Sequence, residues 1–302
     1  MASKEAAQLA ELYAYWAKRT AESNVESLDL LRDLYDGWGK HATEATGVSF
    51  ETVDQDGVKG IWAIPAEAPA DAALLYIHGG GYVGGGSKGH RKLAAHIAKA
   101  AGVKALVIDY RLAPEHLYPA QLEDSRHAFD WLTGQGLRAG RIAVVGDSAG
   151  GALATAVALH LKNTDSPQAG AVVALSPYYD LETRGKSFET NGDKDLIGSR
   201  DGIAENTAMF LGPDGSKTGQ YINALHSDPT GLPPVFISFG GDEVLLDGAH
   251  MFAELARSKG VEVEVEVVPG MQHVFQFLAG TAPEADASIS AIGAFIAKNL
   301  GV

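Results

Sequence analysis

The chain has 302 residues, of which 46% are apolar and 21% charged, the balance of a folded globular protein long enough to bury a large core. Its 24 basic and 38 acidic residues leave a formal net charge of −14, which disfavours nucleic acid and anionic membrane surfaces as partners. There is no cysteine, so disulfides, thiol catalysis and thiolate metal sites are excluded, and we expect a cytoplasmic protein.

Two amphipathic helical patterns open the sequence. Apolar residues recur at helical spacing from Leu9 to Trp16 and again over residues 28–38, where Ser27 stands at the position of a helix cap. From about residue 47 onward, eight short β-branched stretches follow, and most of them alternate with helical patterns. This alternation predicts an α/β fold with a mostly parallel eight-stranded sheet covered by helices on both faces.

Residues 181–230 interrupt the alternation. Gly, Asp, Asn, Ser and Pro separate short helical pieces there, so we expect no strand in this stretch. An insertion of this length in a sheet fold is usually functional, as a lid or as the wall of a binding site.

The glycine-rich stretch HGGGYVGGGSKGH at residues 78–90 follows an apolar strand and fits three motifs. The dinucleotide fingerprint G-x-G-x-x-G requires a helix that begins within the glycines, but the helical pattern starts only near Lys88. A phosphate-binding loop requires lysine before serine or threonine, whereas the order here is Ser87-Lys88. The third motif, G-x-S-x-G around Ser87, is that of a serine hydrolase.

A second G-x-S-x-G, in GDSAG, has the better context for a nucleophile. Ser148 comes directly after the strand RIAVVG and before a helix of small residues, which is the strand-turn-helix that this motif requires. Gly146 and Gly150 remove side chains that would clash in a tight turn. Ser87 follows glycines instead of a strand, so we interpret it as a helix cap.

A nucleophilic serine needs a general base and an acid that orients the base. Asp242 lies just beyond the strand PVFISF, and His273 lies five residues beyond the stretch VEVEVEVV. The order serine, acid, histidine, with both partners on loops after strands, is that of α/β hydrolases. We therefore expect a catalytic triad of Ser148, Asp242 and His273, with Glu243 as the substitute acid.

The glycine loop then has a function in the same reaction. An acyl-transfer intermediate carries an oxyanion, and removing one of its backbone donors typically costs about 3 kcal/mol of barrier. We expect the amides of Gly80, Gly81 and Ala149 to form this oxyanion hole, with His78 and Gly79 supporting the loop.

With these residues in place, the chain resembles the hormone-sensitive-lipase-like esterases of the α/β-hydrolase superfamily, in the GDSAG branch. HGGGYVGGG, DYRLAPEHLYPAQLED, VVGDSAGG, GGDEVLLD and PGMQHVFQ follow in the family's order over nearly the whole chain. DEVLLD and GMQHVF look most like bacterial lactone and acetyl-ester hydrolases. The resemblance implies an α/β-hydrolase core at residues 46–180 and 226–302 and a helical cap at residues 1–45 and 181–225.

The resemblance also implies a homodimer and a scaffold role for YRLAPE, in which Arg111 pairs with Glu115. The alternating valines and glutamates of residues 261–268 predict an edge strand with one solvated face, where a second copy would pair unless the glutamates prevent it.

The function that we expect is hydrolysis of short-chain carboxylic esters, with no cofactor and no metal. Opening of medium-ring lactones by the same triad is an alternative, and a non-catalytic binding protein on the same scaffold is another, although the complete triad argues against it. Bulky side chains are the candidates for lining the substrate pocket, namely Tyr82, Trp16, Trp38, Met209 and Phe210.

Overall fold

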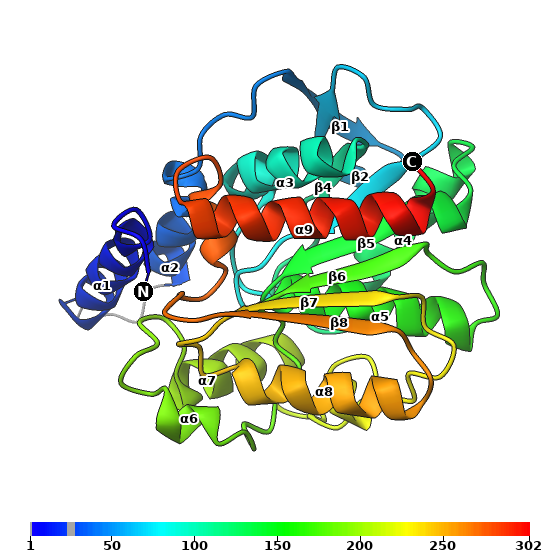
Figure 1. The fold of residues 1–302 in the computed structure, drawn as a ribbon. Coiled ribbons are helices and arrows are strands. Elements are labelled where there is room, and N and C mark those ends of the chain that lie inside the picture. The colour runs from blue at the N-terminus through cyan, green and yellow to red at the C-terminus, as the bar shows by residue number, and fades with distance from the viewer. Residues whose placement is uncertain (1, 23–27) are drawn as a thin grey trace.

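The computed structural model describes residues 2–22 and 28–302 and contains one eight-stranded sheet with helices on both sides (Figure 1). The strands are β1 (Val48–Gln55), β2 (Val58–Pro65), β3 (Ala73–Ile77), β4 (Lys104–Ile108), β5 (Ile142–Asp147), β6 (Ala171–Leu175), β7 (Val235–Gly240) and β8 (Val263–Val268). Their order in the sheet is β1-β2-β4-β3-β5-β6-β7-β8. β2 is antiparallel to both of its neighbours, and every pair from β4 to β8 is parallel. The predicted mostly parallel sheet is confirmed.

The longer helices are α1 (Ala7–Glu22), α2 (Leu28–Tyr35), α3 (Ser87–Ala101), α4 (Ala120–Gly134), α5 (Ala149–Asn163), α7 (Arg200–Leu211), α8 (Leu246–Ser258) and α9 (Pro283–Leu300), and α6 (Ser187–Thr190) is a single turn. Short 3-10 helices lie at Trp38–Lys40, Ala139–Arg141, Ala224–His226 and Phe275–Leu278. None of the helices in the described residues has the length and apolar character needed to cross a membrane. Ser27, expected to cap the second helix, lies outside the described residues.

The central strands are buried on both faces, as a parallel sheet covered by two helical layers requires. Alternate side chains of β3 supply two separate cores: Leu75 and Ile77 belong to the core beneath α4, α5 and α8, and Leu74 and Tyr76 belong to the core beneath α3 and α9. This period-2 division fixes the register of the strand. Because the strands from β4 to β8 are parallel, the loops that follow them lie together at one edge of the sheet.

Two helical regions lie at that edge (Figure 1). We call residues 7–22 and 28–40 the N-terminal cap segment, and residues 187–211 the inserted cap segment. No strand occurs between β6 and β7, as predicted for the insertion. Both segments contribute walls to the cavity at the site described next.

Candidate active site

Ser148 occupies a strained turn between β5 and α5. Its φ of 53° and ψ of −121° place a non-glycine residue in a region that is populated only where the surrounding structure enforces it. A Cβ atom at Gly146 would lie 2.2 Å from the carbonyl oxygen of Gly150, and one at Gly150 would lie 2.0 Å from that of Ile77. The two glycines are therefore required by close backbone approach, which confirms the sequence argument for this turn.

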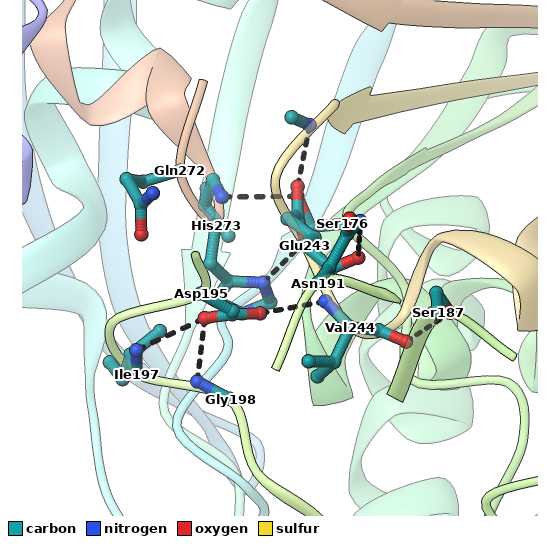
Figure 2. Close-up of polar contacts among 12 residues, drawn as sticks. Ser176, Ser187, Asn191, Asp195, Ile197, Gly198, Glu243, Val244, Gln272 and His273 are labelled. Carbon is teal, nitrogen blue, oxygen red and sulfur yellow. Dashed lines mark hydrogen bonds and ion pairs between the residues drawn. The ribbon is translucent and has the colours of Figure 1, made fainter. Parts of the chain in front are cut away.

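His273 is paired with Glu243 (Figure 2). His273 Nδ1 lies 2.7 Å from Glu243 Oε2, and the Glu243 side chain is fully buried. The other carboxylate oxygen accepts hydrogen bonds from Ser176 Oγ and from the Gly240 amide, each at 2.6 Å. Three donors therefore hold this carboxylate in a single orientation.

Burial and charge act in opposite directions on this pair. Burial raises the pKa of Glu243, and the neighbouring His273 partly opposes that shift. For His273, burial alone would lower the pKa, but the charge of Glu243 and its hydrogen bond raise the pKa above the usual value, with smaller contributions from Asp195 and Asp147. The Glu243 carboxylate thus stabilises the protonated imidazole that general-base catalysis generates.

Glu243 replaces Asp242 as the acid in this site, which corrects the sequence prediction. Asp242 is half-buried, and no hydrogen bond joins its carboxylate to His273 in the part of the chain that the structure describes. β7 ends at Gly240, and the Glu243 amide bonds back to the Gly240 carbonyl at 3.3 Å. This turn directs the side chain of Glu243, rather than that of Asp242, toward the histidine.

The carbonyl group of His273 is held by the N-terminal cap segment. The hydroxyl of Tyr13, on α1, donates to His273 O at 2.7 Å, and Trp38 Nε1 donates to that hydroxyl at 3.0 Å. The next residue, Val274, donates its amide to Ser176 Oγ at 3.0 Å. Of the N-terminal aromatic residues, the sequence made only Trp16 and Trp38 candidates for the pocket wall, and no sequence pattern indicated this contact.

The three amides expected to form the oxyanion hole belong to the glycine loop after β3 and to Ala149, the residue directly after Ser148. Gly80 and Gly81 have φ values of +113° and +61°, and a Cβ atom at Gly80 would lie 2.2 Å from the carbonyl oxygen of Gly84. The amides of Gly80, Gly81 and Ala149 donate to no protein acceptor within residues 2–22 and 28–302. Gly81 lines the same cavity as Ser148, and backbone donors that are free beside a reacting group are what a developing oxyanion needs.

His78 and Gly79, expected to support the glycine loop, form hydrogen bonds at its start. The amide of Gly79 donates to Asp147 Oδ1 at 3.1 Å, and His78 Nδ1 lies 2.7 Å from the Gly79 carbonyl oxygen. Burial, together with the nearby His90, lowers the pKa of His78 to about 4. His78 is therefore neutral at physiological pH, with the Nδ1 proton donated to Gly79.

A cavity of about 570 Å³ opens over these groups. Ser148, His273 and Gly81 lie at its base, and both cap segments form its walls, including the predicted Trp16, Trp38 and Met209 together with Tyr13, Leu31, Tyr35, Asp195, Ile203 and Asn206.

Tyr82 and Phe210, which were also expected to line the pocket, do not line this cavity. Their rings stack on each other with centroids 3.8 Å apart and an interplanar angle of 11°. Each side chain is 1% exposed, so the pair belongs to the core beneath the cavity. Stacking satisfies both rings without any contribution from a substrate.

Two further expectations need correction. Ser87 does not cap its helix: its amide and its hydroxyl both donate to Asp109, at 2.6 and 2.8 Å, and Gly86 is the capping residue. Buried and bonded in this way, Ser87 is not a rival nucleophile.

Arg111 and Glu115 do not pair with each other. Arg111 instead bonds to Asp124 and Glu123 of α4, and Glu115 forms a two-pronged ion pair with Arg32 of α2 at 2.7 Å for both contacts. The YRLAPE stretch is thus held by side chains of α2 and α4, and not by a pair within the stretch.

No group of three or more histidine, aspartate or glutamate side chains is arranged to hold a metal ion among the described residues.

The fold and the site together define the class of protein, an α/β hydrolase with a serine at the turn after β5.

Comparison with known proteins agrees with this class. A family model described as an alpha/beta hydrolase fold matches residues 74–277. An acetyl-hydrolase of Streptomyces hygroscopicus is 34% identical over 240 residues, which cover 80% of each chain. The crystal structure of an esterase from the bacterial hormone-sensitive lipase family matches with a TM-score of 0.92 at 35% identity, and that of EstE5 soaked with p-nitrophenyl butyrate matches with a TM-score of 0.89 at 32% identity, both over 100% of each chain. The chain belongs to the α/β-hydrolase family, in its hormone-sensitive-lipase-like branch.

Proposed function

We propose that the protein hydrolyses short-chain carboxylic esters through an acyl-enzyme on Ser148. The observation that carries this proposal is the buried His273–Glu243 pair, because His273 lines one cavity with Ser148 at its strained turn and with Gly81 of the glycine loop. Each group has a defined part in acyl transfer, and no cofactor is needed.

In this mechanism His273, acting as general base, takes the proton of Ser148 as the hydroxyl oxygen attacks the ester carbonyl carbon. The amides of Gly80, Gly81 and Ala149 stabilise the resulting oxyanion. His273 then gives the proton to the departing alcohol, and the acyl-enzyme forms. Water, activated by the same histidine, attacks the acyl carbonyl in the second half and releases the acid. Glu243 keeps the imidazole in the tautomer that each step requires.

The walls of the cavity support a small substrate. Bulky aromatic side chains from the N-terminal cap segment and Met209 from the inserted cap segment limit the space above Ser148. The named activity of the acetyl-hydrolase relative and the p-nitrophenyl butyrate used with EstE5 point the same way. A lactone presents the same carbonyl to the serine, so lactones belong in the same substrate screen, but no specific feature of the site favours them over open esters.

Replacing the nucleophile tests the reaction. Ser148→Ala is expected to lower kcat on p-nitrophenyl butyrate by about 10⁴-fold or more, because the triad acts as one unit, while the thermal unfolding temperature stays close to that of the parent. A fluorophosphonate probe should label Ser148 in the parent protein, as located by peptide mass spectrometry. Ser87→Ala is the matched control, and labelling at Ser87 would overturn the assignment.

A chain-length series tests the substrate class. We expect kcat/KM on p-nitrophenyl esters to peak between about two and six acyl carbons, because each methylene that the cavity cannot hold forfeits about 1 kcal/mol. Specificity constants that continue to rise from butyrate to palmitate would rule out the short-chain proposal and leave the reaction type intact.

A further inference from the structure

The inserted cap segment brings a second carboxylate to the catalytic histidine. Asp195 is 8% exposed and lines the same cavity as His273. Its Oδ1 accepts hydrogen bonds from the amides of Ile197 at 3.0 Å and Gly198 at 2.7 Å, and its Oδ2 accepts from the amide of Val244 at 2.8 Å (Figure 2). Three amide donors compensate the buried charge of this carboxylate.

The Val244 contact is the important one, because Val244 directly follows Glu243. Asp195 therefore connects the inserted cap segment to the loop that carries the triad acid. Asn191 adds to the same connection: its Nδ2 donates to the carbonyl oxygen of Glu243 at 2.9 Å and to that of Gly241 at 3.2 Å. The acid loop is thus held from the side of the cap by two side chains.

The histidine loop is tied to the same stretch of cap. Gln272, the residue before His273, donates to the carbonyl oxygen of Lys194 at 2.9 Å and accepts from the amide of Leu196 at 3.0 Å. Residues 191–198 consequently bond to both loops whose side chains must meet for catalysis.

We propose that Asp195 is a positioning residue of the catalytic centre, which fixes the Glu243 loop against the cap and adds negative charge beside His273. This inference rests on the proposed ester hydrolysis, in which His273 alternates between neutral and protonated forms. Asp195 stabilises the protonated form from the cap side, as Glu243 does from the sheet side, so the inserted cap segment is part of the catalytic apparatus in addition to being a pocket wall.

The electrostatic surroundings of His273 support this role. Three carboxylates act on the imidazole: Glu243 most strongly, then Asp195 and Asp147, and all three raise its pKa against the lowering effect of burial. The Tyr13 hydroxyl faces the same residue but bonds to its backbone carbonyl. Removing the Asp195 charge therefore lowers the pKa of His273 while leaving the Glu243 hydrogen bond in place.

The test is Asp195→Asn, which keeps the size of the side chain and removes its charge. We expect kcat to fall about tenfold or more, as the loss of a hydrogen bond to a charged group implies. We also expect the acid limb of the kcat/KM profile to move to lower pH by about half a unit or more, since a nearby opposite charge favours the protonated imidazole. A purely structural defect would lower the amplitude of the profile without moving its limb.

Asp180→Asn is the matched control. Asp180 is 2% exposed and also accepts hydrogen bonds from backbone amides, those of Glu182, Arg184 and Gly185, but it is not one of the main charges that raise the pKa of His273. The control variant should keep the position of the wild-type limb. If the acid limb of the kcat/KM profile moves equally in Asp195→Asn and Asp180→Asn, or moves in neither variant, the proposal is overturned.

Asp195→Glu provides a second variant that keeps the charge and changes the geometry. We expect it to retain the wild-type limb position with a reduced kcat. The pH dependence of fluorophosphonate labelling at Ser148 gives the same limb without substrate turnover, so weakly active variants remain measurable. If the wild-type protein neither hydrolyses esters nor labels at Ser148, the proposed function fails. If it does both and Asp195→Asn keeps its limb, only the role of Asp195 fails.

Discussion

The carboxylates of Asp242 and Glu243 are neighbours in sequence and lie in different surroundings. Glu243 is fully buried with three hydrogen-bond donors, and Asp242 is half-buried. The sequence places both just beyond β7, and which side chain turns inward depends on the backbone turn at Gly240, which no residue pattern reveals. For this reason the position of the acid loop was predictable and the identity of the acid was not.

This pair gives a direct test of the assignment. Glu243→Gln is expected to lower kcat by about 10³–10⁴-fold, because an amide can no longer stabilise the protonated His273. Asp242→Asn should leave kcat within about twofold of wild type, as expected for a surface substitution away from the reacting groups. Steady-state kinetics on one ester measures both, and the reverse ranking would restore Asp242 as the acid.

Tyr13 offers a second test at the level of a single atom. Tyr13→Phe removes the hydroxyl that donates to His273 O and accepts from Trp38 Nε1. We expect kcat to fall about five- to tenfold, in proportion to one hydrogen bond, with KM little changed because the ring stays in the cavity wall. Tyr15→Phe on the same helix, at an exposed position, is the control and should behave as wild type.

The charge state of His273 predicts the pH dependence of the reaction. The base must be neutral to accept the proton of Ser148, and its pKa lies above the usual 6.5. Activity is therefore expected to be lost as the pH falls through a midpoint above 6.5. A kcat/KM profile over the acid and neutral range measures this midpoint, and a limb centred at or below 6.5 would contradict the electrostatic description.

At the scale of elements, Arg32 ties α2 to the core by hydrogen bonds, in addition to the apolar packing of Leu31 and Tyr35. Arg32 donates to the carbonyl oxygen of Val83 at 2.7 Å and to that of Ala113 at 3.1 Å, besides its ion pair with Glu115. Val83 lies in the loop that carries the oxyanion-hole glycines. The arginine thus fixes the N-terminal cap segment over the glycine loop, with planar geometry that a lysine cannot reproduce.

Arg32→Lys is accordingly expected to raise KM about three- to tenfold, because α2 is then held less firmly and the cavity wall that it forms is less well ordered. We also expect this variant to lower the free energy of unfolding by about 1 kcal/mol. Lys18→Ala on α1 removes an exposed pair with Glu22 and should change neither quantity. KM on a short ester and chemical denaturation measure the two effects. An unchanged KM in Arg32→Lys would show that this attachment does not shape the cavity.

The helices and strands could be predicted from the sequence more fully than the contacts between them. The strands and the serine turn follow from local patterns, which are fixed by nearest neighbours in the chain. Tyr82 and Phe210 show the limit: each is a bulky residue near the site, and only the packing of α7 against the glycine loop decides that they stack on each other instead of facing the cavity. Arg32 and Glu115 pair although they lie 83 positions apart in the sequence. No local sequence pattern predicts a contact between residues so far apart.

At the scale of the whole molecule, β8 forms one edge of the sheet. The predicted alternation holds over residues 261–264, where Val261 and Val263 are buried and the two glutamates are exposed, but it fails at Glu266 and Val267. Glu266 is half-buried and accepts hydrogen bonds from Ser238 and Ser288, whereas Val267 is 37% exposed. An exposed valine on an edge strand invites pairing with a second copy, and we propose a homodimer formed along β8.

Light scattering at micromolar concentration should therefore give twice the mass of the chain. Val267→Lys is expected to give a monomer, because a charge on an edge strand opposes pairing. Val302→Lys, at a terminal valine that is 46% exposed, should remain dimeric. A monomeric mass for the parent protein would exclude this assembly.

The reacting groups and the walls of the cavity come from different parts of the molecule, and this difference affects how the substrate range can change. Every reacting group comes from the sheet and its loops, where Gly80, Gly146 and Gly150 admit no larger residue. Most of the wall comes from the two cap segments, where Leu31 and Met209 are only partly buried. Variation in a population of related genes, or in a mutant library, can therefore reshape the wall at little cost to the reaction. The exceptions are Tyr13, whose hydroxyl holds the His273 carbonyl, and the stretch around Asp195, where a change selected for a new substrate would also alter the pH at which the enzyme works.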